Sequence, residues 1–150
     1  SGWSRQPRKI DNVRCVHGCA ALDALLQETD VLFSVLPSTT ETQHLLNAQR
    51  LALLPKDAAL INAGRGTLID QDALLDLLNQ QHLRFVLLDV FAEEPLPATH
   101  PFWQHPSVLI TPHVAADTIP GEAVAQIAAN MQALANGNPV AGKVDRHRGY

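Results

Sequence analysis

Four short apolar runs, each bounded by turn residues, dominate the hydrophobic pattern of the chain. They occupy residues 31–36, 58–63, 85–90 and 108–111. Apolar residues follow one another within each run, whereas a strand with one solvated face would alternate apolar and polar positions. The pattern predicts four strands of a parallel sheet, each buried on both faces.

Helical periodicity appears between and after these runs, at residues 20–27, 42–54, 71–80 and 120–135. Asp70 is placed to cap the third of these helices, and Asn136-Gly137-Asn138-Pro139 is a stop signal after the fourth. Strands that alternate with helices are typical of βαβ crossovers. The predicted fold class is therefore α/β, with a doubly wound parallel sheet.

Composition narrows the classes of partner. The 150 residues are 46% hydrophobic and 17% charged, as expected for one globular domain. A net charge of −4 argues against nucleic acid and against an anionic membrane surface. No apolar run approaches the ~20 residues that span a bilayer. Cys15 and Cys19 lie in a stretch that reads as a turn and form no zinc pattern, so no metal site is predicted. The small number of cysteines indicates a reducing compartment, and a cytoplasmic setting is expected.

Reactive side chains follow three of the predicted strands, at the edge where a parallel sheet gathers its ligands. Arg65 lies between two glycines, and its planar guanidinium suits a carboxylate. His113 follows the last run, and an imidazole has a solution pKa of about 6.5, suited to proton transfer. Either Glu93 or Glu94 is placed to orient that histidine. The plainer alternatives are a surface arginine in a glycine turn and a packed or capping histidine.

Two common motifs are missing from the sequence. There is no G-x-S-x-G elbow, which argues against a serine hydrolase. The dinucleotide fingerprint G-x-G-x-x-G is also missing, and Gly64-Arg65-Gly66-Thr67 does not supply it.

Three ordered segments, Asn62–Gly66, Asp89–Pro97 and Thr111–Ala115, together resemble the D-2-hydroxyacid dehydrogenase family. The likeness covers essentially the whole chain, with a similar loop at residues 36–42 and an ending at 144–150 that resembles the bacterial glyoxylate/hydroxypyruvate reductase branch. The resemblance implies a Rossmann-like cofactor domain and reduction of glyoxylate and hydroxypyruvate to glycolate and glycerate. The alternatives are another 2-hydroxyacid specificity, or a non-catalytic nucleotide-binding or corepressor module.

The resemblance also implies a role for each reactive residue. Arg65 would bind the carboxylate and keto oxygen of a small 2-keto acid, and His113 would be the general acid. Glu94, directly before Pro95, would orient the histidine, and Asp89 would hold the nicotinamide carboxamide. The full set of expected cofactor contacts is Ser4, Arg5, Leu36, Pro37, Thr42, Ala63, Gly64, Arg65, Asp89, His113 and Ala115.

The basic segment at residues 3–9, Trp-Ser-Arg-Gln-Pro-Arg-Lys, indicates which cofactor is used. In the Rossmann fold an acidic residue after the second strand, where the resemblance places this segment, accepts the ribose hydroxyls of NAD, whereas arginine accommodates the extra phosphate of NADP. The segment holds three cations and no acid, and Ser4 adds a hydroxyl donor. It therefore predicts NADPH, with NADH bound more weakly; the alternative is an exposed basic turn.

The start of the chain suggests a fragment, because Ser1 is not an initiator methionine and residues 2–5 read as the end of a strand. Residues 1–118 are expected to be a partial dinucleotide-binding domain whose first strand and glycine loop lie upstream. Residues 119–150 are expected to be an interdomain helix and a tail that returns to a substrate domain. The isolated chain is then expected to be inactive, and the full-length protein a homodimer.

Overall fold

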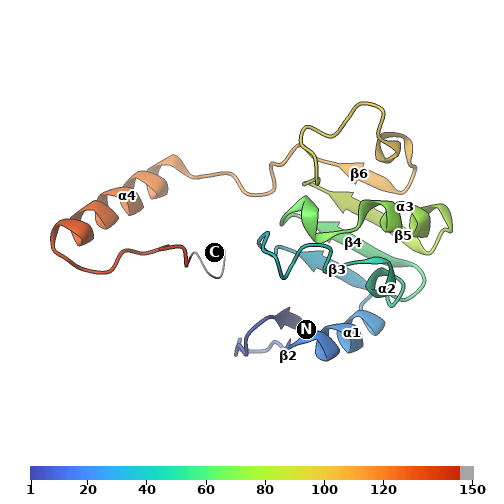
Figure 1. The fold of residues 1–150 in the computed structure, drawn as a ribbon, viewed down its shortest axis with the longest axis horizontal. Helices are drawn as coiled ribbons and strands as arrows, with labels where there is room; N and C mark the ends of the chain where they lie inside the picture. Colours follow the sequence, from blue (N-terminus) through green and yellow to red (C-terminus); the bar gives the residue numbers. More distant parts are fainter. Residues whose placement is uncertain (146–150) are drawn as a thin grey trace.

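The computed structural model describes residues 1–145, and all its ladder pairs of strands are parallel. A two-stranded sheet pairs β1 with β2, and a four-stranded sheet has the order β3-β4-β5-β6 (Figure 1). This confirms the parallel α/β class. The strands are β1 (Gly2–Ser4), β2 (Cys15–His17), β3 (Val31–Ser34), β4 (Ala58–Asn62), β5 (Leu83–Leu88) and β6 (Val108–Ile110).

The chain winds outward in two directions from the space between β1 and β3. On one side β2 follows β1, and on the other side β4, β5 and β6 follow β3 (Figure 1). A cleft of about 910 Å³ separates the two sheets and is lined by residues of both β1 and β3. The strand order therefore reverses between β1 and β3, and doubly wound folds bind ligands outside the carboxyl ends of the strands beside such a reversal.

Three helices pack on one face of the larger sheet. They are α1 (Cys19–Gln27), α2 (Ala48–Leu51) and α3 (Gln71–Asn79), and two short 3-10 turns follow strands, η1 (Gly66–Leu68) and η2 (Pro101–Gln104). Asp70 caps α3 as predicted, accepting the Ala73 N–H at 3.1 Å. Leucines of the three helices form one core with Leu60 and Val86 of the sheet, and Phe102 of η2 is 1% exposed in that core.

The opposite face of the larger sheet departs from the expectation that every strand is buried on both sides. Val31 and Phe33 of β3 are 50% and 59% exposed, and Leu109 of β6 is 49% exposed. Their neighbours on the other face, such as Leu60, are fully buried. The prediction was wrong on this point, because helices α1–α3 cover only one of the two apolar faces.

The helix expected at residues 42–54 was also wrong, since only α2 is helical there. His44 has a φ of 48°, which breaks the helical path, and Leu46 forms a parallel bridge with Ile69. Asn47 then starts the short helix by accepting the Arg50 N–H at 3.0 Å. The apolar spacing that looked helical instead comes from a loop whose leucines are buried.

Strand β2 was missed, because the region of Cys15 was read as a turn, whereas the expected strand at residues 2–5 is present as β1.

The last helix, α4 (Pro120–Ala135), has the predicted bounds. It extends away from the sheets (Figure 1), and none of its residues is buried. Residues 146–150 of the predicted interdomain segment and ending lie outside the described part. In the described residues, no helix is both long and apolar enough to cross a membrane.

Candidate functional site

Arg65 lies in the loop after β4, which the buried side chain of Asn62 holds in place. The Asn62 amide donates to the Arg65 carbonyl at 3.1 Å, and its oxygen accepts the Gly64 N–H at 3.2 Å. A Cβ on Gly64 would lie 2.7 Å from the Leu36 carbonyl oxygen, so this close approach requires glycine. The loop therefore presents Arg65, whose side chain is exposed, at the carboxyl end of the sheet.

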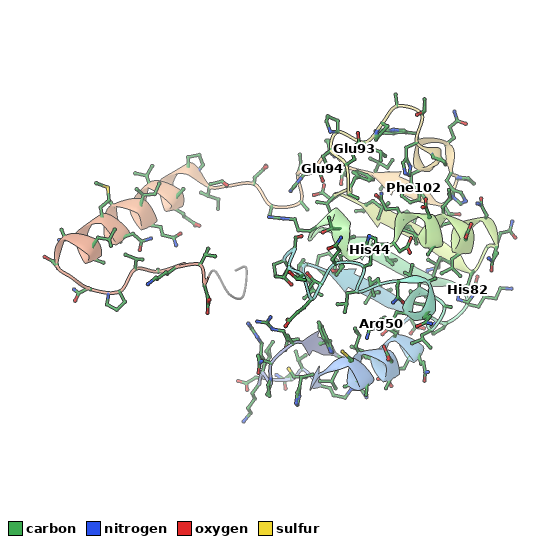
Figure 2. The ribbon with its side chains drawn as sticks, in the orientation of Figure 1. His44, Arg50, His82, Glu93, Glu94 and Phe102 are labelled. Atoms are coloured by element: carbon green, nitrogen blue, oxygen red, sulfur yellow. The ribbon has the colours of Figure 1, made fainter. Side chains whose placement is uncertain are left out.

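Glu94 and His113 form the central pair of the site. The His113 Nδ1 and the Glu94 Oε2 are 2.8 Å apart, and the other carboxylate oxygen accepts the Phe91 N–H at 2.8 Å. Glu94 belongs to the loop that follows β5, and both glutamates lie at the end of the sheet from which the chain leaves for α4 (Figure 2). The residues alone left Glu93 as a rival, the family resemblance selected Glu94, and the histidine pairs with Glu94.

Asp89 fixes the backbone on which His113 stands. The Asp89 carbonyl accepts the His113 N–H at 2.9 Å, and the carboxylate accepts the N–H groups of Val114 and Ala115 at 2.9 and 3.0 Å. The Thr111 hydroxyl donates to the same carboxylate at 2.5 Å. His113 has a φ of 56°, a left-handed conformation that a non-glycine residue adopts only when its surroundings enforce it. Asp89 supplies that enforcement, a role that the sequence did not reveal.

A small cleft brings the three reactive residues together. It measures about 320 Å³ and is lined by Arg65, Glu94 and His113, together with Ser38, Gly66, Thr67, Phe91 and Ala92. A guanidinium, an imidazole and a carboxylate bonded to that imidazole thus converge on a space that holds a small molecule. Such a set can bind an anion and transfer a proton beside it.

The expected cofactor residues lie along the same edge of the sheets. Ser4 ends β1 and Arg5 follows it, and Leu36 lines the large cleft after β3. The Thr42 hydroxyl instead bonds within its own loop, donating to the Pro37 carbonyl at 2.7 Å. Ala63 and Gly64 follow β4, while Asp89 is 1% exposed and its carboxylate bonds to the chain itself. Nicotinamide binding by Asp89 stays a prediction.

Hydrogen bonds favour the charged form of both carboxylates in the site. The Phe91 N–H, and then the bond with His113, lower the pKa of Glu94. Burial raises the pKa of Asp89, but the bonds from Thr111, Val114 and Ala115 outweigh it and leave that pKa lowered. Both groups are therefore anionic in the folded protein near neutral pH.

These lowered pKa values predict a loss of stability in acid. A carboxylate whose pKa is lower in the folded than in the unfolded state stabilises the fold above its unfolded pKa, and that stability disappears as the pH falls through the folded value. We expect the free energy of unfolding to decrease below about pH 4. Asp89→Asn should lower stability at neutral pH and flatten its acid dependence in urea denaturation curves. Asp76→Asn, at an exposed position of α3, is the control and should change neither; equal pH dependence in the two variants would contradict the assignment.

Comparison with known proteins places the chain in a family. A model of the D-isomer specific 2-hydroxyacid dehydrogenase NAD binding domain matches residues 1–115. The chain therefore belongs to the D-isomer specific 2-hydroxyacid dehydrogenases.

The relatives and solved structures agree with this membership. Glyoxylate/hydroxypyruvate reductase A of Serratia proteamaculans is 48% identical over 99% of this chain, which covers 47% of that relative. A D-isomer specific 2-hydroxyacid dehydrogenase of Xanthobacter autotrophicus, solved with NADPH and MES, is 44% identical with a TM-score of 0.97, over 99% of this chain and 62% of that one. An NADPH-dependent glyoxylate/hydroxypyruvate reductase of Sinorhizobium meliloti, solved with NADP and sulfate, is 36% identical with a TM-score of 0.93, over 99% and 48% of the two chains. The chain spans about half the length of the curated relatives it matches.

Proposed function

We propose that the full-length protein carrying this chain reduces small 2-keto acids, glyoxylate and hydroxypyruvate among them, with NADPH. The observation that carries the proposal is the convergence of Arg65, Glu94 and His113 on one cleft at the carboxyl ends of β4, β5 and β6. The names of the relatives support the substrates, and the NADPH and NADP complexes of two solved relatives support the cofactor.

The donor set at the end of β1 fits a cofactor with a ribose phosphate. Ser4 supplies a hydroxyl and Arg5 a guanidinium, and residues 3–9 contain no carboxylate that could accept ribose hydroxyls. When bound, the nicotinamide supplies a hydride from its C4 atom to the keto carbon. Ser4 and Arg5, at the carboxyl end of β1, would hold the phosphate, and Leu36 and Gly64, in the loops after β3 and β4, would border the cofactor.

Within the small cleft each residue has a separate task. The Arg65 guanidinium holds the substrate carboxylate and stabilises negative charge that develops on the keto oxygen. His113 in its protonated form donates a proton to that oxygen, which leaves a 2-hydroxy acid. Glu94 keeps the Nδ1 side of the ring engaged, so that Nε2 is the ring nitrogen available to the substrate. This division of roles accounts for all three side chains.

A reductase assay with a matched pair of arginine variants tests the proposal. Purified full-length protein should consume NADPH when glyoxylate or hydroxypyruvate is added. Arg65→Lys keeps the charge but loses the planar fork, and should lower kcat/KM by about two to three orders of magnitude. Arg84→Lys, at an exposed position of β5, should leave kcat/KM unchanged. A full-length protein that binds NADPH but reduces neither acid would instead indicate a binding module or another 2-hydroxyacid specificity.

We also propose that the protein acts in the cytoplasm as a homodimer. The two thiols, Cys15 and Cys19, are free, which suits a reducing compartment. Exposed apolar side chains on α4, such as Ile127 at 59% and Met131 at 66%, suit burial against another polypeptide surface.

A further inference from the structure

An ion pair joins Arg5, the residue directly after β1, to Glu41, in the loop that follows β3. The Arg5 Nη1 and the Glu41 Oε2 are 2.5 Å apart, although the two residues lie 36 positions apart in the sequence. The arginine side chain is 30% exposed and the glutamate 64%, so both groups remain within reach of a ligand in solution. Neither residue lines the small cleft of Arg65, Glu94 and His113, so this contact plays no part in the proton transfer proposed above.

The loop that carries Glu41 is braced by hydrogen bonds. The Thr42 hydroxyl donates to the Pro37 carbonyl at 2.7 Å and accepts the Thr39 N–H at 2.8 Å. The Thr42 N–H also donates to the Thr39 carbonyl at 3.1 Å. Glu41 therefore stands on a closed turn that holds its backbone opposite Arg5, which makes the pair a feature of the fold rather than a chance meeting of two long side chains.

A carboxylate and a phosphate compete for the same guanidinium. Both anions use the planar fork of arginine, and a phosphate that approaches Arg5 meets a carboxylate already bonded to it. The incoming phosphate must either displace Glu41 or accept the repulsion of a second anion at close range. A cofactor without the phosphate meets neither obstacle.

Resting on the NADPH assignment above, we propose that Glu41 is a specificity-determining residue that competes with the 2′-phosphate for Arg5. Its carboxylate weakens binding of cofactors that carry this phosphate and leaves binding of those without it unchanged. Glu41 thereby reduces the preference for cofactors with a 2′-phosphate that Arg5 creates. Charge removal at Glu41 then acts in the opposite direction from charge removal at Arg5.

Isothermal titration of the full-length protein with adenosine 2′,5′-bisphosphate and adenosine 5′-monophosphate tests this without turnover. Glu41→Gln is close in shape to glutamate but uncharged, and should tighten the bisphosphate about two- to fivefold, in keeping with the modest strength of an exposed ion pair. Binding of the monophosphate should not change. Asp23→Asn is the matched control, because Asp23 also forms a partly exposed ion pair, with Arg50, and lines neither cleft, so that both affinities should stay unchanged.

The Arg5→Ala variant separates failure of this inference from failure of the cofactor assignment. If Arg5→Ala weakens the bisphosphate and Glu41→Gln tightens it, both hold. If Arg5→Ala weakens it but Glu41→Gln leaves it unchanged or weakens it, the competition is refuted while the phosphate site stands. If Arg5→Ala has no effect on the bisphosphate, the phosphate site itself is wrong, and the role of Glu41 falls with it.

Discussion

His113→Gln is expected to lower kcat for keto-acid reduction by about two to four orders of magnitude, with little change in the Kd for NADPH. Glutamine offers hydrogen-bond donors but no proton that it can release near neutral pH. The amide can still reach Glu94, which bonds to His113 Nδ1 at 2.8 Å, so the loop should keep its shape. Steady-state kinetics with glyoxylate, paired with fluorescence titration of NADPH, separates the chemical step from cofactor binding.

Another histidine close to His113 in the sequence, His105, provides the control. His105 precedes β6 and accepts the Ser107 N–H at 3.2 Å through its Nδ1, a role that asparagine can replace. His105→Asn should therefore retain full turnover. Reduction that survives in His113→Gln would assign the proton donor to another group and leave the His113–Glu94 pair with a structural role only.

The parts of the fold that the sequence predicts well are those fixed by local signals. The bounds of α4 follow from Pro120 and from the stop signal after Ala135, and α3 follows from the Asp70 cap. The prediction of a helix at residues 42–54 is wrong because buried leucines can have helical spacing in the sequence whether or not the backbone is helical. Its course is decided instead by the bridge between Leu46 and Ile69, a long-range contact that no window of sequence contains.

The candidate site follows the same division. Residue types and strand ends are sufficient to place Arg65, a glutamate and His113 at one edge, because parallel strands align their carboxyl ends. They do not reveal that Asp89 bonds to the backbone of residues 114 and 115, since this depends on the left-handed turn at His113. The Arg5–Glu41 pair was likewise invisible, because it requires the relative placement of two sheets.

Gly66→Ala is expected to destabilise the protein by about 3 kcal/mol and to abolish most of its activity. A Cβ at this position would overlap backbone atoms of Phe91 and Ala92, which cannot rotate away as a side chain can. The loop that carries Arg65 and the loop that carries Glu94 thus pack backbone against backbone at Gly66, which leaves no room for a side chain there. Because the Phe91 N–H bonds to Glu94, displacement of this backbone would also move the carboxylate that holds His113.

Urea denaturation and reductase assays on the same preparations separate the two effects. Activity per folded molecule should fall in Gly66→Ala, because the carboxylate and the imidazole no longer meet at the distance that the loops impose. Gly121→Ala is the matched control, since a Cβ there meets nothing within 4 Å and alanine suits a helix better than glycine. Unchanged stability and turnover in Gly66→Ala would mean that the two loops do not touch in solution. The hydrogen bonds of Asp89 to residues 113–115 would then be sufficient to position the His113–Glu94 pair.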